Sequence, residues 1–130
     1  MANLAQPLHC AYVLAVPDAE ATARWWQTMF GFERWLEPQG WVFVRRGACD
    51  LRLGSCPDAL APHETGDHNY FGVVLVDAID ALFEEARARG LSSLAPPQDQ
   101  PWGMREMIVQ TPDGHRLVFA QQMHADVEES

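Results

Sequence analysis

The chain contains the same local pattern twice, at a spacing of 59 residues. Each copy begins with an apolar run that predicts a strand, over residues 8–16 in the first copy. An Asp, an amphipathic segment and a Gly follow, with Asp18 and Gly31 in the first copy and Asp77 and Gly90 in the second. Asp is typical of a helix N-cap, and Gly adopts the left-handed conformation that often ends a helix. The inward stripes of the two predicted helices are Thr22, Trp25, Trp26 and Met29, and Ile79, Leu82, Phe83 and Ala86. The repeat therefore predicts two similar modules, each with one helix packed on a small sheet.

Strand-like sequence follows each predicted helix. In the first half it covers residues 40–54, and in the second it covers residues 104–120, where a Pro-Asp-Gly turn at 112–114 predicts a β-hairpin. We expect a single domain over residues 1–130, with module one at about 7–56, a linker at 57–68, module two at about 69–122 and an acidic tail at 123–130. If Tyr12 and Leu14 pack on the helix, His9, Ala11 and Val13 face the other way, although alternation alone also permits the mirror assignment.

Composition excludes several classes of function. The chain has 9 basic residues, all Arg, against 18 acidic ones, for a formal net charge of −9. We therefore expect no nucleic-acid partner, and the absence of Lys excludes Schiff-base catalysis on a side chain. No apolar run is long enough to predict a membrane span. The three cysteines fit a reduced cytoplasmic protein better than a disulfide scaffold.

The stretches "VPDAEATARWWQTMFGFE" and "TPDGHRLVFA", together with the paired modules, resemble the vicinal oxygen chelate superfamily over about residues 7–122. This superfamily includes glyoxalase I, extradiol dioxygenases, fosfomycin-resistance enzymes and bleomycin-resistance proteins. The resemblance implies an α+β fold of two tandem βαβββ modules, which form a cup-shaped mixed sheet with the helices packed outside. It also implies a homodimer in which cups are shared between chains.

The resemblance further implies where metal ligands would lie. In this sequence those positions fall near Ala11, Arg52, Phe71 and Val118. Three of these residues are apolar and one is cationic, whereas a divalent ion needs several neutral or anionic donors. The sequence therefore departs from the metal-enzyme pattern, and we predict neither a metal nor a cofactor.

Two other groups have donor atoms suited to a metal. His9 lies on the same predicted strand face as Ala11, but a single His is more typical of a hydrogen-bonded wall residue. His63, Glu64, Asp67 and His68 lie together in the linker, where such residues are common. We interpret both groups as structural, with metal binding as the open alternative.

Aromatic and arginine residues supply the candidate ligand contacts. Trp25 and Trp26 are expected in the core, whereas the other three Trp lie on or beside strands and loops, where core packing and ligand contact are both open. Arg52 and Arg116 would share the cup face and need a counter-charge from Asp50, from Glu106 or from an anionic ligand. The predicted ligand-binding residues are His9, Ala11, Trp35, Trp41, Phe43, Arg52, Phe71, Trp102, Arg116 and Val118.

These observations favour a metal-independent binding protein of the bleomycin-resistance type over an enzyme. It would sequester an aromatic or cationic small molecule, such as an antibiotic, in a dimeric cup. The acidic composition favours a cationic ligand, and the Arg pair argues against one. The alternatives are a metal-dependent glyoxalase-like lyase, isomerase or dioxygenase, and a domain that only mediates protein association.

Overall fold

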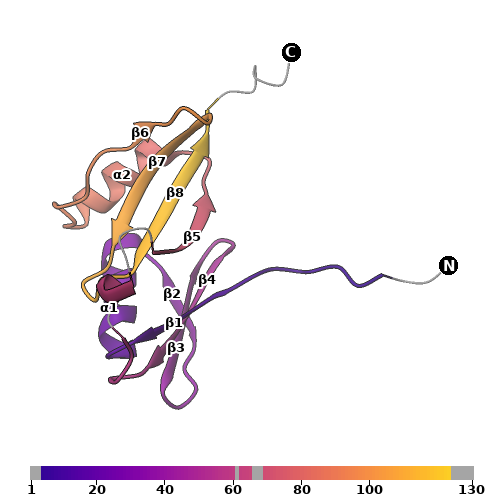
Figure 1. The fold of residues 1–130 in the computed structure, drawn as a ribbon, viewed down its shortest axis with the longest axis vertical. Coiled ribbons are helices and arrows are strands. Elements are labelled where there is room, and N and C mark those ends of the chain that lie inside the picture. The colour runs from indigo at the N-terminus through magenta and orange to yellow at the C-terminus, as the bar shows by residue number, and fades with distance from the viewer. Residues whose placement is uncertain (1–3, 61, 66–68, 124–130) are drawn as a thin grey trace.

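The computed structural model describes residues 4–60, 62–65 and 69–123 (Figure 1). Module one consists of β1 (Tyr12–Val16), α1 (Ala19–Phe30), β2 (Glu33–Leu36), β3 (Trp41–Arg46) and β4 (Cys49–Ser55). A short 3-10 turn, η1 (Pro62–Thr65), lies in the linker. Module two consists of β5 (Tyr70–Leu75), α2 (Ile79–Ala88), β6 (Gln98–Asp99), β7 (Met104–Gln110) and β8 (Arg116–Gln122). The predicted α+β architecture of two repeated modules is confirmed.

Each module builds a four-stranded mixed sheet with the same topology. The strand orders are β1-β4-β3-β2 and β5-β8-β7-β6. In both sheets the first strand pairs in parallel with the last, and the remaining pairs are antiparallel. The Pro-Asp-Gly segment connects β7 to β8, and Gly114 has the positive φ that this turn requires. The predicted hairpin is therefore present.

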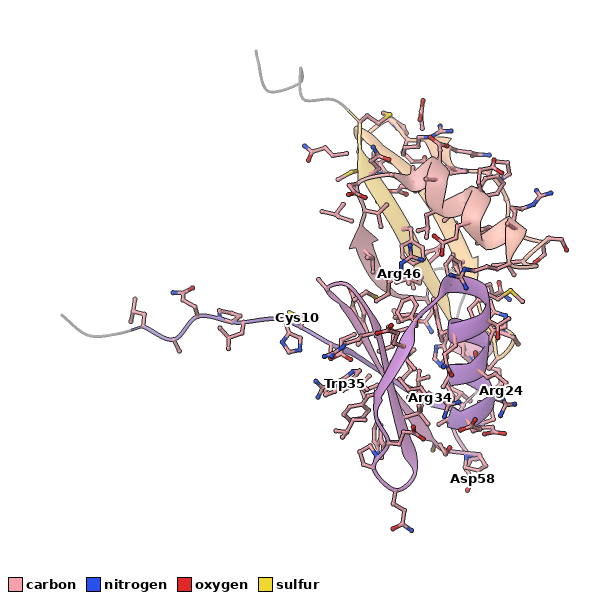
Figure 2. The ribbon with its side chains drawn as sticks, turned by 180° about the vertical axis from the view of Figure 1, so that it is seen from behind. Cys10, Arg24, Arg34, Trp35, Arg46 and Asp58 are labelled. Atoms are coloured by element: carbon pink, nitrogen blue, oxygen red, sulfur yellow. The ribbon has the colours of Figure 1, made fainter. Side chains whose placement is uncertain are left out.

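Both helices lie on the same side of the two sheets (Figure 2). Each sheet consequently buries one face under its helix and leaves the other face without a helix. The segment before β1 extends away from the body of the molecule. Its described residues, 4–11, form no strand, and β1 begins at Tyr12 and not near residue 8 as the apolar run suggested.

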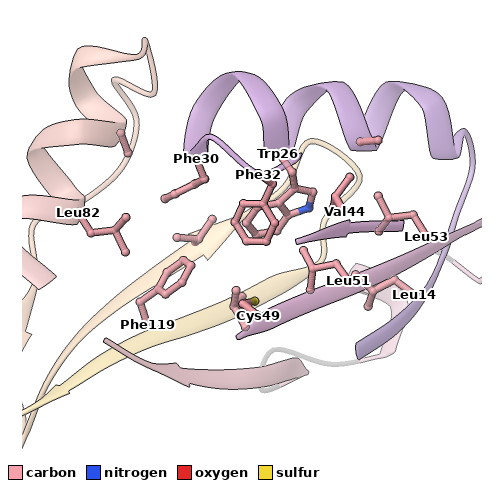
Figure 3. Packing of buried hydrophobic residues seen from close by; sticks show 14 of the residues in the cluster. Leu14, Trp26, Phe30, Phe32, Val44, Cys49, Leu51, Leu53, Leu82 and Phe119 are labelled. Atoms are coloured by element: carbon pink, nitrogen blue, oxygen red, sulfur yellow. The ribbon is translucent and has the colours of Figure 1, made fainter. Parts of the chain in front are cut away.

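A single hydrophobic core joins the two modules (Figure 3). Trp26 and Phe30 of α1 are fully buried, and Phe32 packs against the Trp26 ring with centroids 5.0 Å apart. Phe30 also reaches Phe119 of β8 in the other module, at 5.6 Å. The predicted inward stripe of α2 is buried throughout, whereas Trp25 and Met29 of α1 are only partly buried.

The two helices begin differently despite the repeat. Asp18 caps α1, because its carboxylate accepts hydrogen bonds from the backbone N–H groups of Glu20 and Ala21. The expected cap of α2 by Asp77 is wrong. Ala78 occupies the N-cap position, and the Ile79 N–H donates instead to Gln121 Oε1 at 2.7 Å. A side chain from β8 thus replaces the local cap.

Polar contacts between the modules surround this core. Arg46 of β3 donates two hydrogen bonds to the Glu85 carboxylate of α2, each 2.9 Å long. The Tyr12 hydroxyl donates to the Val73 carbonyl oxygen. His115 Nε2 lies 3.0 Å from the Ala15 carbonyl oxygen. Within the described part of the chain, no helix is long and apolar enough to cross a membrane.

Candidate functional site

The strand register defines which side chains lie on the sheet faces that no helix covers. In the first sheet Val13, Arg52 and Phe43 are directly opposite one another, and Ala15, Gly54 and Trp41 form the next row. The alternate residues Leu14, Leu51, Leu53, Val42 and Val44 are buried under α1. We call the uncovered surface of this sheet the first open face; it comprises Val13, Ala15, Trp35, Leu36, Trp41, Phe43, Arg45, Asp50, Arg52 and Gly54. The mirror assignment left open by alternation is thereby excluded.

The second sheet has an equivalent surface, although its strand β5 is irregular. Val73 lies opposite Val118, and Leu75 lies opposite Ala120. Leu117 and Phe119 alternate with these residues and are buried toward α2. We call this surface the second open face; it comprises Tyr70, Val73, Leu75, Met104, Glu106, Ile108, Gln110, Arg116, Val118 and Ala120.

Asp50 is the polar centre of the first open face. Its side chain is only 6% exposed, and both carboxylate oxygens have partners. Oδ1 accepts a hydrogen bond from Trp35 Nε1 at 3.2 Å, and Oδ2 accepts one from the Arg52 guanidinium at 3.1 Å. His9 Nε2 lies 3.5 Å from Oδ2. Asp50 therefore fixes the orientations of Trp35 and Arg52, and it is the counter-charge of Arg52 that the sequence suggested.

The guanidinium groups of this face stack on its aromatic rings. Arg52 Cζ lies 4.8 Å from the Phe43 centroid and 5.5 Å from that of Trp35. Arg45 Cζ lies 5.0 Å from the Trp35 centroid. Figure 2 shows Trp35 on the side away from α1, whereas its neighbour Arg34 points toward that helix. Trp35 is thus already engaged by the protein's own cations.

Trp41 presents an open ring at the end of the same face. A β-carbon at Gly54 would lie 2.8–3.1 Å from three atoms of the Trp41 ring, so glycine allows the ring to lie directly on β4. The ring also meets Phe43 edge-on, with centroids 6.2 Å apart. Trp41 nevertheless remains 38% exposed. This geometry leaves the indole available for stacking by a planar group.

The second open face repeats the pairing of a tryptophan with a carboxylate. Trp102 Nε1 donates to Glu106 Oε2 at 2.8 Å, while the Trp102 side chain itself is exposed. Arg116 stacks over Tyr70, with Cζ 5.3 Å from the ring centroid. Val118 is 8% exposed and lies between Val73 and Ile108 on the neighbouring strands. Glu106 therefore engages the indole of Trp102.

The structure brings most predicted ligand-binding residues onto the open faces, but not all of them. Trp35, Trp41, Phe43 and Arg52 lie on the first face, and Arg116 and Val118 lie on the second, with Trp102 at its edge. His9 belongs to the extended segment before β1, and Ala11 directly precedes that strand. Phe71 packs between the modules against Tyr12 and His115, at 5.6 and 6.0 Å.

Five further polar or aromatic residues of these faces were not among the predicted contacts: Asp50, Arg45, Glu106, Tyr70 and Gln110. Strand alternation places Asp50 and Arg45 beside residues that were predicted, so this signal was present in the sequence. Tyr70 was hidden by the irregularity between Tyr70 and Gly72, which shifts the register of β5 by one residue.

A groove of about 860 Å³ separates the two modules on one side. Residues 73–78 form one wall, and residues 46–50 form the other. Phe30, Phe32 and Phe119 contribute apolar surface, while Arg46 and Glu85 lie at the same groove. His9 and Asp50 also line it, so the groove reaches the first open face.

Cys49 lies beneath this region and is no candidate nucleophile. Burial raises the pKa of the Cys49 thiol to about 11, and the neighbouring Asp50 carboxylate adds to the shift. The thiolate is the reactive form of cysteine, so this side chain stays protonated and inert near neutral pH. Cys10 and Cys56 are exposed free thiols.

The fold and the open faces define a two-module α+β protein with an aromatic, apolar and uncovered surface. The model of the Glyoxalase/Bleomycin resistance protein/Dioxygenase superfamily matches residues 6–119, and the chain belongs to this family. No curated protein matches the chain at a significant level.

Solved structures show the same fold. The chain is similar to TioX from Micromonospora sp. ML1, with 25% identity and a TM-score of 0.68 over 90% of this chain and 100% of that one. It is also similar to a bleomycin-binding protein from bleomycin-producing Streptomyces verticillus in complex with copper(II)-bleomycin, with 25% identity and a TM-score of 0.70 over 89% and 97% of the two chains. A glyoxalase-related enzyme from Clostridium phytofermentans shares the fold at 19% identity, with a TM-score of 0.73 over 92% and 98%.

The residues present do not fit the metal centre of the family's metalloenzymes. The positions that the resemblance implies for the metal ligands fall near Ala11, Arg52, Phe71 and Val118, none of which offers an electron pair to a metal at neutral pH. Among the described residues, no three His, Cys, Asp or Glu side chains converge as a metal site would require. Of the linker residues with suitable donors, Asp67 and His68 lie outside the described residues.

Proposed function

We propose that this protein binds a small organic molecule against its open sheet faces and acts by sequestration, without a metal or a chemical step. The proposal rests on one observation: many of the exposed bulky apolar side chains lie on the two open faces. These are Val13, Leu36 and Trp41 on the first face, and Tyr70, Val73, Leu75 and Ile108 on the second. Exposed apolar surface of this extent, with polar groups placed among it, is typical of ligand or partner binding.

We further propose that a second copy of the chain completes the site. Each open face is one wall of a cup, and two chains placed face to face would bury the apolar residues of both and enclose a ligand. The extended segment before β1 supports this arrangement, since Leu4 and Leu8 are exposed on it. The three free cysteines fit a reducing cytoplasm as the location.

Sequestration is favoured over catalysis by the chemistry of the faces. Asp50 is buried with both oxygens engaged, and Glu106 accepts a hydrogen bond from Trp102 Nε1, so both carboxylates have a structural role on these faces. The similarity to a bleomycin-binding protein crystallised with its ligand supports binding of an antibiotic or another toxic organic compound. Sequestration needs affinity and enough protein, but no stabilisation of a transition state.

The proposal is tested by titrating the purified protein with copper-free bleomycin and a panel of aromatic compounds, using isothermal titration calorimetry. We expect saturable binding at one ligand per cup, and a dimer by sedimentation equilibrium. Replacing Trp41 with Leu should weaken binding at least severalfold without unfolding the protein, because the ring is partly exposed. Replacing Trp25 with Leu, on the helix side, is the matched control for tryptophan loss.

Two results would contradict the proposal. Stoichiometric transition metal in protein purified without chelator, with turnover that depends on it, would establish the glyoxalase-like alternative. A dimer that binds none of the compounds would establish a domain for protein association alone.

A further inference from the structure

The charged groups of the first open face differ in how accessible they are to a bound molecule. Asp50 is buried, and Trp35, Arg52 and His9 surround its two oxygens. Arg52, in contrast, is 31% exposed and donates to Asp50 through only one of its terminal nitrogens. The carboxylate at the centre is thus withdrawn from a ligand, while the guanidinium beside it retains further N–H donors.

Arg45 adds a second accessible cation next to Arg52. It lies opposite Asp50 in the register, is exposed, and is held by stacking on Trp35. No described carboxylate forms an ion pair with it. Glu33 lies opposite Arg45 on the edge strand β2 and is also exposed. On the central strands β3 and β4 the accessible charge of this face is therefore positive, although the whole chain carries a formal charge of −9.

The aromatic rings of this face also differ in availability. Trp35 and Phe43 are covered by the guanidinium groups of Arg45 and Arg52, which occupy the positions a ligand cation would take. Trp41 has one ring face on Gly54 and the other open. Trp41, Phe43 and Arg45 are alternate residues of β3 and lie on the same face. Phe43 is the middle one, and the Arg52 guanidinium stacks on its ring. An open stacking surface thus lies on the same face as two guanidinium groups, with Arg52 the nearer of the two and Arg45 one step farther along the strand.

From this arrangement we propose that the first open face selects a planar aromatic anion, such as an aryl carboxylate or sulfonate. The ring of the ligand stacks on Trp41, its anionic oxygens accept hydrogen bonds from Arg52, and Arg45 adds positive charge to the same face. The inference rests on the proposed binding function and specifies its ligand class. It runs against the cationic ligand that the acidic composition alone favours. Asp50 is a positioning residue in this scheme, because it holds Arg52 and Trp35 without touching the ligand.

The test compares four naphthyl probes of matched size by calorimetry on the full-length protein. These are naphthoate, naphthalene sulfonate, neutral naphthylmethanol and the cation of naphthylmethylamine. We expect the two anions to bind at least about tenfold more tightly than the cation at low salt, and this ratio to fall as salt is added.

Variants then assign the selectivity to named groups. Arg45→Gln should lower the anion-to-cation ratio about two- to fivefold, as expected for one exposed cation. Arg52→Gln should lower it further, and circular dichroism checks its fold because Asp50 loses its partner. Arg24→Gln, on the outer surface of α1, removes the same charge and should leave the ratio unchanged. Trp41→Leu should weaken all four probes to a similar extent.

The outcomes separate the two proposals. If the cation binds as tightly as the anions, or if Arg45→Gln and Arg24→Gln have equal effects on the ratio, the ligand class is wrong while the binding function stands. If none of the four probes, bleomycin or the wider panel binds, the binding function itself fails, and the inference fails with it.

Discussion

The Tyr12 ring lies across β5 where the β-carbon of residue 72 would be. A β-carbon built on Gly72 would come within 2.4–2.8 Å of three Tyr12 atoms, closer than real contacts allow. This arrangement lets the Tyr12 hydroxyl reach the Val73 carbonyl oxygen and connects β1 with β5. Glycine is therefore required at residue 72 by close approach, and its backbone φ is not in the positive range.

We predict that Gly72→Ala lowers the free energy of unfolding by about 1–3 kcal/mol, because the added methyl group overpacks the contact with Tyr12. Urea denaturation of the variant measures this loss. The double variant Gly72→Ala with Tyr12→Ala should lose less than the sum of its single changes, because the clash disappears with the ring. Strict additivity of the two losses would contradict the proposed contact.

The candidate site was predictable from the sequence to the extent that strand alternation was regular. Trp41, Phe43 and Arg52 fall on one face because their strands alternate without interruption. The role of Asp50 was visible only as a possible counter-charge, since its bond to Trp35 depends on an irregularity in the pairing of β2 and β3 between Arg34 and Leu36. Phe71 was misplaced for the same kind of reason, since β5 is irregular beside it.

Among the secondary-structure elements, the helices followed the sequence pattern more closely than the strands did. The apolar spacing predicted both helices, and Gly31 ends α1 with φ of 67° as expected. The start of β1 was predicted too early because an apolar run does not show whether a partner strand is present. In this chain only residues 12–16 of the apolar run pair with β4. The first-turn contacts of α2 depend on Gln121, which is 42 residues away in sequence and therefore outside any local signal.

The two matched aspartates should consequently differ in their effect on stability. Asp18→Ala is expected to lower the free energy of unfolding by about 1 kcal/mol, because two backbone N–H groups of α1 lose their acceptor. Asp77→Ala should change it by a few tenths of a kcal/mol at most, since the Asp77 side chain does not cap α2. Thermal or urea denaturation of both variants measures the difference, and equal losses would show that Asp77 caps α2 after all.

At the scale of the whole molecule, ionic contacts hold the modules in a fixed relation. Arg46 extends from β3 to the Phe30 carbonyl oxygen and to Glu85, and Arg89 also binds Glu85. The hydrogen bonds from Arg46, together with the charges of Arg46 and Arg89, lower the pKa of the Glu85 carboxyl below its ordinary value of 4.5. Repetition in the sequence predicted the two modules, but it contained no information on contacts that occur only once between them.

The pH dependence of stability should reveal this contact. Because the folded-state pKa of Glu85 is lowered, its contribution is complete above about pH 4.5 and is lost as pH falls through the folded-state value. We expect Glu85→Gln to cost about 1 kcal/mol or less at pH 7, since the pair is partly exposed, and the deficit to shrink below pH 4.5. Denaturation curves at several pH values measure this change.

Glu84→Gln is the matched control, since Glu84 is exposed on the same helix. It should show neither the loss at pH 7 nor the convergence with the unmodified protein in acid. A Glu85→Gln deficit that stays constant down to pH 2 would mean that charge plays no part in this contact.

The packing of Phe30 against Phe119 has a consequence for how the chain denatures. A repeated architecture suggests two modules that unfold independently. In this chain, however, the two rings belong to one shared core, so one module cannot unfold while the other keeps its packing. Opening either half would expose the aromatic side chain of the other to water. Heating should therefore give one cooperative calorimetric peak, without a separate transition for each module.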